Sequence, residues 1–123
     1  MHKIYCYCRV AREENGNLEE QKEVVTNYCK KSSLKIDKFF CESGSGMKLN
    51  QELCNMVNCL NIGDIVIVKD RARLSRNNVL FQMIKDAIYE QGARLVVVDE
   101  ATTTEPDFED IITQIQCLLK TKQ

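Results

Sequence analysis

The sequence predicts an α/β domain in which a mostly parallel sheet of four or five strands lies between two layers of helices. Short apolar runs alternate with amphipathic segments along the chain, as in successive βαβ units. Two of these runs, residues 65–68 and 95–98, are continuously apolar, which is typical of strands that helices cover on both faces. The length of 123 residues fits one domain, so we expect residues 1–123 to fold as a single unit.

The first βα unit occupies the start of the chain. Residues 3–8 are rich in β-branched and aromatic side chains and predict a strand, and the polar residues 9–16 predict the loop after it. Asn17 and Glu20 have the spacing of a capping box at the start of a helix. The face that this helix turns to the core follows helical spacing and consists of Leu18, Gln21, Val25, Tyr28 and Cys29.

The second unit combines a strand, a glycine-rich loop and a helix. Residues 34–40 predict the strand, and the Gly/Ser-rich residues 42–49 predict a mobile loop. The next helix is expected to run from a cap at Asn50 to just before Gly63. Its inward residues are Leu53, Met56, Val57 and Leu60.

The two continuously apolar strands frame the third helix. Strand 65–68 is followed by a charged segment, residues 69–76, which we expect to be a loop. The helix opens at Asn77 or Asn78 and stops at Gly92, after which the second apolar strand follows. Its buried residues are Leu80, Phe81, Ile84 and Ile88.

Composition and charge exclude several classes of protein. With 17 basic and 18 acidic residues the formal net charge is −1, so the chain as a whole does not attract nucleic acid. Any DNA binding must therefore be local or come from a part of the protein outside this chain. No apolar stretch is long enough to span a membrane and the N-terminus lacks a signal-peptide pattern, so a cytoplasmic location is expected.

The cysteines do not have the spacing of a metal site. They contain no Cys-x-x-Cys pair, and His2 is the only histidine. We expect them to pack as small apolar side chains and expect no metal site. The seven cysteines are Cys6, Cys8, Cys29, Cys41, Cys54, Cys59 and Cys117.

Three of the predicted loops, residues 9–16, 42–49 and 69–76, follow the carboxyl ends of strands, which is where ligands bind in parallel sheets. Guanidinium groups bind phosphate oxygens two at a time, so several together can hold a phosphate or a pentacoordinate phosphorane without a metal. The alternative is that the basic residues form an ordinary solvated turn. The basic and hydroxyl side chains concerned are Arg9, Arg12, Ser43, Ser45, Lys69, Arg71, Arg73, Ser75 and Arg76.

Several short motifs resemble those of the serine recombinases, the resolvase/invertase family. Residues 7–10, Tyr-Cys-Arg-Val, with Leu18 and Gln21, resemble the family's Tyr-x-Arg-Val-Ser opening and its following Leu-x-x-Gln. Residues 42–44, Glu-Ser-Gly, resemble its Asp/Glu-x-Ser-Gly loop. Gly-Asp at residues 63–64 and Arg-Leu-Ser-Arg at residues 73–76 resemble its Gly-Asp…Asp-Arg-Leu-Ser-Arg signature. The resemblance covers residues 3 to about 115 in the family's order.

The resemblance implies a resolvase-like catalytic domain that cuts and rejoins DNA. In the family a serine at the end of the first strand attacks a DNA phosphodiester, and arginines stabilise the phosphorane. Strands are exchanged within a tetramer, and the covalent intermediate keeps the bond energy, so neither ATP nor a metal nor any other cofactor is implied. The implied active-site residues are Arg9, Ser43, Arg73 and Arg76, and the implied supporting residues are Gln21, Asp70, Arg71 and Lys48.

Three positions depart from the family pattern. Ala11 occupies the nucleophile position and has no hydroxyl with which to form the covalent intermediate. Ala72 replaces an expected aspartate, and the nearest acid is Asp70. Asn50 replaces an expected arginine, and Lys48 supplies a charge nearby without the guanidinium fork. The candidates for a substitute nucleophile, which strand-end geometry disfavours, are Ser43, Ser45 and Ser75.

A last helix is expected from Pro106 and Asp107 onward, and its apolar stripe either packs in the core or contacts a partner. In the family this helix lengthens, dimerises and leads to a separate DNA-binding domain, which this chain does not contain before Gln123. The resemblance therefore implies a homo- or hetero-oligomer that forms through the last helix. The stripe consists of Phe108, Ile111, Ile112, Ile115, Leu118 and Leu119.

Two functions follow from the sequence. The first is a catalytic-domain homologue of a site-specific DNA recombinase for strand exchange, inactive as written because Ala11 replaces the serine nucleophile. The alternative is a non-catalytic module that binds DNA phosphates or forms oligomers and so regulates a recombinase. Ala11 and Ala72 together favour a chain without catalytic activity, with DNA as its partner.

Overall fold

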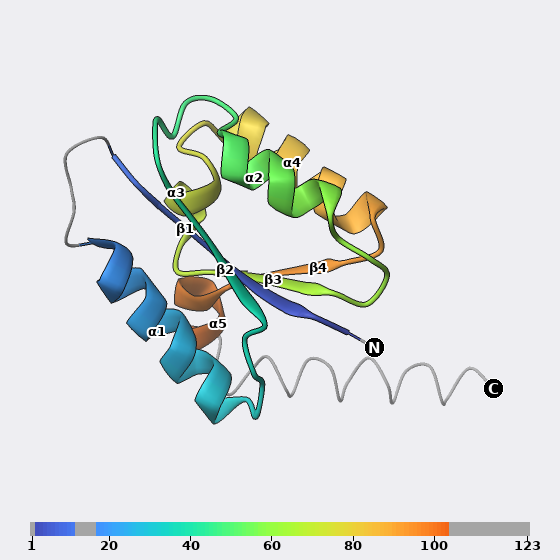
Figure 1. Cartoon of the computed structure of the whole chain (residues 1–123). Coiled ribbons are helices and arrows are strands. Elements are labelled where there is room, and N and C mark those ends of the chain that lie inside the picture. The colour runs from blue at the N-terminus through green and yellow to red at the C-terminus, as the bar shows by residue number, and fades with distance from the viewer. Residues whose placement is uncertain (1, 12–16, 104–123) are drawn as a thin grey trace.

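The computed structural model describes residues 2–11 and 17–103, which form an α/β domain built on a four-stranded sheet (Figure 1). All neighbouring strands run parallel, in the order β2-β1-β3-β4. The predicted fold class is therefore confirmed. The strands are β1 (Ile4–Val10), β2 (Lys38–Ser43), β3 (Ile65–Val68) and β4 (Arg94–Val97).

Helices cover both faces of the sheet, as the apolar strands predict. Helix α1 (Asn17–Lys31) and α5 (Val98–Thr103) lie on one face, and α2 (Gln51–Asn58) and α4 (Asn78–Glu90) lie on the other (Figure 1). None of the described helices is both long and apolar enough to cross a membrane.

Alternate residues of β1 belong to the two halves of the core, because successive side chains of a strand point to opposite faces. Tyr5 and Tyr7 pack on the side of α2 and α4, and Cys6 and Cys8 pack on the side of α1. Cys29 is also buried, so core packing is confirmed for three thiols, whereas Cys59 is exposed and Cys117 lies outside the described residues. Within the described part of the chain, no group of His, Cys, Asp and Glu side chains could hold a metal ion.

Several predicted boundaries are wrong. Strand β1 continues through Val10, and β2 begins at Lys38 and continues through Ser43, because the two strands pair as far as Val10 and Ser43. Helix α2 ends at Asn58, four residues before the predicted end. The continuous apolar run 95–98 conceals a change of structure, because β4 ends at Val97 and α5 begins at the next residue.

The segment 69–76 is not wholly a loop, because it contains the one-turn helix α3 (Arg71–Leu74). Leu74 anchors this turn in the core and is fully buried. The amide of Ser75 donates to the carbonyl of Arg71 (3.1 Å), which closes the turn. The predicted last helix, with its apolar stripe, lies outside the described residues.

Candidate active site

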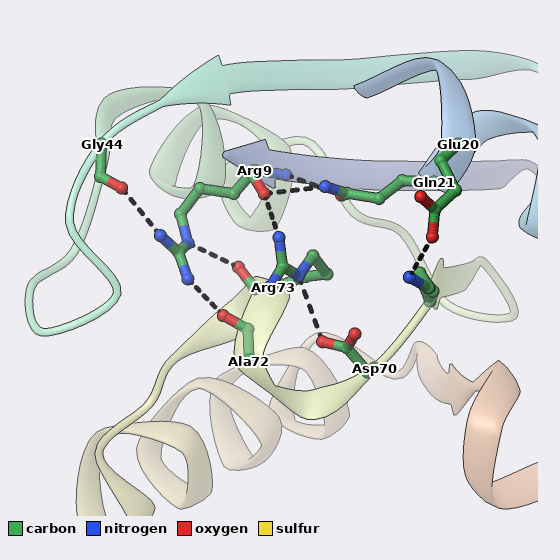
Figure 2. A network of polar contacts seen from close by, with 8 residues as sticks. Arg9, Glu20, Gln21, Gly44, Asp70, Ala72 and Arg73 are labelled. Carbon is green, nitrogen blue, oxygen red and sulfur yellow. Dashed lines mark hydrogen bonds and ion pairs between the residues drawn. The ribbon is translucent and has the colours of Figure 1, made fainter. Parts of the chain in front are cut away.

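Arg9 lies at the carboxyl end of β1 with only 1% of its surface exposed, and its guanidinium group binds backbone carbonyls of two other segments. Nη1 donates to the carbonyl of Gly44 (2.7 Å), and Nε donates to that of Arg73 (3.1 Å). Nη2 donates to the carbonyl of Ala72. Figure 2 shows these bonds spreading from one guanidinium to the glycine loop and to α3. Arg9 therefore joins the segments that follow β1, β2 and β3 into one site.

The side chain of Arg73 in turn binds the backbone of Arg9. Its Nη1 donates to the Arg9 carbonyl (2.6 Å), and its Nε pairs with Oδ1 of Asp70 (3.1 Å; Figure 2). The ion pair spans three positions, as do neighbouring side chains within one helical turn. An acid therefore reaches this arginine from Asp70, although Ala72 stands where the sequence pattern expects the aspartate.

Gln21 completes the hydrogen bonding of the strand end. The ladder between β1 and β3 stops at Cys6 and Ile67, before Arg9 is reached. The Gln21 side chain, from α1, accepts from the Arg9 amide (3.0 Å) and donates to the Arg9 carbonyl (2.9 Å). Gln21 is itself buried, so it acts as a substitute for a strand partner and satisfies backbone groups that water does not reach.

The site concentrates positive charge around the buried guanidinium of Arg9. Burial lowers the pKa of Arg9, and the neighbouring charge of Arg73 lowers it further. Tyr7 and Asp70 oppose this shift in the Arg9 pKa, while the charge of Arg76 adds to it. A bound anion would relieve the repulsion among the three guanidinium groups, so the arrangement favours a negatively charged ligand.

A pocket of about 520 Å³ opens beside Arg9, between the ends of β1 and β2 and the glycine loop. It brings together six residues that the sequence indicates for the site: Arg9, Ala11, Ser43, Ser45, Lys48 and Arg76. Arg73 contacts Arg9 and Asp70 contacts Arg73, but neither lines the pocket. The lining residues are Arg9, Ala11, Ser43, Gly44, Ser45, Gly46, Met47, Lys48, Asn50 and Arg76.

Gly46 is held between two arginines, which closes the glycine loop against the site. A β-carbon at this position would lie 2.6 Å from Nη2 of Arg9 and 2.9 Å from Cγ of Arg76, so a larger residue would displace the loop. The Gly46 carbonyl accepts from the Arg76 amide (2.9 Å) and from the Ser75 hydroxyl (2.9 Å). Ser75 is buried and also accepts from the Asn77 amide (3.0 Å), so its hydroxyl is occupied by structural bonds.

The hydroxyl groups beside the pocket come from β2 and the glycine loop. Ala11 directly follows β1 and lines the pocket with a methyl group. Ser43 pairs with Val10 in the register of β1 and β2, and its side chain is exposed. The exposed Ser45 accepts from the Met47 amide (3.0 Å). No hydroxyl therefore occupies the strand-end position held by Ala11.

Glu42 and Asn50 have roles that the sequence did not reveal. Asn50 precedes α2 as predicted, but its side chain makes no capping bond and instead donates to the Ser45 carbonyl (2.8 Å). The Glu42 carboxylate caps α2 by accepting from the amides of Glu52 and Leu53 (both 3.0 Å). Glu42 belongs to β2 and not to the residues at the start of α2, so a search for local capping patterns finds no signal for this cap.

Glu42 also accepts a hydrogen bond from the hydroxyl of Tyr7 (2.5 Å). Burial and this hydrogen bond raise the pKa of Tyr7 well above its ordinary value, so the phenol stays protonated. The pair links β1 to the cap of α2, one residue before Ser43 of the pocket wall.

Other predicted residues lie apart from the pocket. Arg71 pairs with Glu100 of α5, and its guanidinium carbon lies 4.6 Å from the centre of the Phe81 ring. Lys69 pairs with Glu20 of α1 (2.7 Å). Neither Arg71 nor Lys69 lines the pocket. The predicted loop residue Arg12 lies outside the described residues.

Comparison with known proteins gives a family match over nearly the whole chain. The model of the family described as "Resolvase, N terminal domain" matches residues 4–121. No curated protein matches the chain significantly.

Several solved structures share the fold. The C-terminal catalytic domain of ISC1926 TnpA, an IS607-like serine recombinase, is 22% identical with a TM-score of 0.67, covering 96% of this chain and 82% of that one. That of IS1535 TnpA, also an IS607-like serine recombinase, is 25% identical with a TM-score of 0.64, covering 77% and 70%. A resolvase family site-specific recombinase from Streptococcus pneumoniae is 18% identical with a TM-score of 0.65, covering 100% of both chains.

Proposed function

The chain belongs to the family of the resolvase N-terminal domain, the catalytic domain of serine recombinases, and on that basis we propose that residues 1–123 are a recombinase catalytic-domain homologue that holds a DNA phosphate without cutting the strand. The observation that carries this proposal is the composition of the pocket wall. Ala11 lines it at the end of β1, beside the cationic side chains of Arg9, Lys48 and Arg76. The pocket thus combines groups that bind phosphate with a methyl group at the nucleophile position.

Each lining group has a distinct part in the proposed binding. In the proposed complex the exposed side chains of Lys48 and Arg76 bind the phosphate oxygens, and the Ser43 hydroxyl donates a neutral hydrogen bond. The charge of Arg9 is buried, so little water screens it and its attraction for the phosphate is stronger than that of an exposed cation. The Arg73–Asp70 pair and Gln21 position Arg9 through its backbone. Ala11 has no oxygen with which to attack phosphorus, so the phosphodiester stays intact.

Restoring the missing groups tests this proposal. We expect the Ala11→Ser/Ala72→Asp variant, fused to a DNA-binding domain of known specificity, to form covalent adducts with a duplex that carries the matching site. The same fusion with the native sequence should form none. Adducts are measured on a denaturing gel with end-labelled DNA.

Two further variants of the restored protein locate the phosphate. Arg76→Ala should abolish adduct formation, because Arg76 lines the pocket, whereas Arg71→Ala removes the same charge outside it and should preserve the adducts. Adducts formed by the native chain would contradict the proposal. The absence of adducts from the restored chain would show that the pocket does not hold a phosphate next to position 11.

A second observation favours oligomer formation as a further function. An apolar groove of about 290 Å³ lies between α2 and α4, and Met83 on its rim is 61% exposed. We propose that the apolar stripe of residues 108–119 from a second copy fills this groove.

Sedimentation tests this proposal. We expect a monomer–dimer equilibrium, which Met83→Glu shifts to monomer and Gln82→Glu leaves unchanged. A native monomer at all concentrations contradicts it.

A further inference from the structure

The amino edge of the sheet, at the opposite end of the strands from the pocket, carries a group of exposed lysines. Figure 1 shows the end of α1 and the starts of β1 and β2 at this end of the domain. The Ile4 carbonyl accepts from the Asp37 amide (2.7 Å), which joins the start of β1 to the segment before β2. The members of this group, here called the amino-edge lysines, are Lys3, Lys30, Lys31, Lys35 and Lys38, and all five are exposed.

The amino-edge lysines have no acidic partner in the described part of the chain. Among residues 2–11 and 17–103, none of them forms an ion pair, whereas Lys22, Lys69, Arg71 and Arg73 each do. Lys38 instead lies over the ring of Phe40, with Nζ 4.5 Å from its centre. Within residues 2–11 and 17–103, no ion pair therefore neutralises the charge of these lysines.

Two carboxylates hold the starts of β1 and β3 by binding backbone amides. Asp37 accepts from the amide of Ile4 (2.8 Å). Asp64 is buried and accepts from the amides of Lys3 (2.9 Å) and Asn61 (2.8 Å). Asp37 and Asp64 thus hold the strand starts together and form no ion pair with the five lysines, which keep their positive charge although the whole chain has a formal net charge of −1.

Helix capping explains only part of this pattern. Lys30 and Lys31 lie in the last turn of α1, where cations interact favourably with the helix dipole. Lys3, Lys35 and Lys38 lie outside that helix and gain nothing from it. No large apolar side chain is exposed between residues 30 and 38, and the exposed ones next to this edge are Phe39 (37%) and Ile62 (83%). With five lysines against these two side chains, the edge is dominated by charge and not by the apolar anchors on which lipid insertion or a typical protein interface depends. A partner with many regularly spaced charges fits it better.

We propose that the amino-edge lysines bind the phosphate backbone of duplex DNA without sequence preference. The choice of DNA among polyanions rests on the proposed function, but the site itself is separate from the pocket. Because the two sites lie at opposite ends of the strands, one domain would contact two segments of DNA. Lysines neutralise phosphates as point charges and release counterions, which makes such binding strongly salt-dependent.

A titration of the full ¹⁵N-labelled chain with a duplex of arbitrary sequence at low salt tests the proposal. We expect the backbone amide signals of residues 30–38 to shift. The variant Lys30→Gln/Lys31→Gln/Lys35→Gln should bind at least about tenfold more weakly, and the slope of log Kd against log salt should fall by about 2 to 3. The matched control, Lys22→Gln/Lys69→Gln/Lys85→Gln, changes the net charge equally elsewhere and should stay within about twofold of the native affinity.

The outcomes separate this site from the pocket. Shifts confined to residues 43–48 and Arg76 would overturn the amino-edge proposal while agreeing with the proposed function. Shifts at residues 30–38 that persist in the Lys48→Ala/Arg76→Ala variant support the amino edge whatever the adduct experiment shows. Equal losses in the two lysine variants, or equally tight binding of polyglutamate, would also overturn it. Circular dichroism melting verifies that each variant is folded.

Discussion

At the scale of single residues, the buried and half-buried polar side chains around the pocket bind mainly to backbone groups. Arg9 donates to three carbonyls, Glu42 accepts from two amides, and Asn50 donates to the carbonyl of Ser45. Such bonds satisfy groups that would otherwise be buried without partners, which costs more than a typical hydrogen bond contributes. The polar residues of the site therefore position the loops as well as supply charge.

Gln21 provides the sharpest test at this scale. In a Gln21→Met variant, which keeps the length of the side chain, the buried Arg9 amide loses its acceptor. We expect the free energy of unfolding to fall by about 1–3 kcal/mol, measured by urea denaturation. The control is Gln82→Met on α4, where the exposed amide donates only to Asp86. If both substitutions cost the same, the Gln21 bridge contributes no stability.

At the scale of elements, the sequence predicted what depends on local pattern and missed what depends on distant contacts. Strand β3 and the start of α4 follow from a continuous apolar run and from Asn77, whose side chain caps the helix by accepting from the amide of Leu80 (3.0 Å). Helix α3 was missed, because four residues are too few to show helical periodicity. It is stabilised by the burial of Leu74 and by the bonds from Arg9, which comes from another strand.

In the candidate site, too, the sequence predicted the general position of the residues but not the distant contacts that orient their side chains. The rule that ligands bind at the carboxyl ends of parallel strands predicted that Arg9, Ser43 and Arg76 would lie near one another, and all three line one pocket. The rule does not say which cations point into the pocket and which support it from outside. Arg71 binds Glu100 and Phe81 instead, because α3 turns its side chain toward α4 and α5.

At the scale of the whole molecule, the fold encloses a set of reduced thiols in the core between the sheet and α1. Cys6 and Cys8 lie with their Sγ atoms 3.6 Å apart on β1, and Cys29 of α1 packs in the same cluster. The contact with Cys6 and burial raise the pKa of Cys8, and burial raises that of Cys29. Burial also raises the pKa of the partly exposed Cys41 to about 11. The raised pKa values keep Cys8, Cys29 and Cys41 neutral at pH 7 in the folded state.

The thiol cluster predicts that the domain loses stability in mild alkali. A pKa raised in the folded state contributes stability that is complete below the unfolded value, near pH 8.5 for cysteine, and that falls as the pH rises above it. Because Cys8 ionises only after unfolding, it should lower the free energy of unfolding by about 2 kcal/mol between pH 7.5 and pH 10.

Urea denaturation under reducing conditions at these two pH values measures the loss. The Cys8→Ala variant should be less stable at pH 7.5 but lose about 2 kcal/mol less on going to pH 10, since its slope with pH lacks one titrating group. Val25→Ala, which shortens a buried apolar side chain of the same cluster without removing a titrating group, should keep the native slope. If the free energy of unfolding of Cys8→Ala has the native slope with pH, the Cys8 thiol ionises as readily in the folded core as in the unfolded chain. Burial of this thiol cluster would then not account for the loss of stability in alkali.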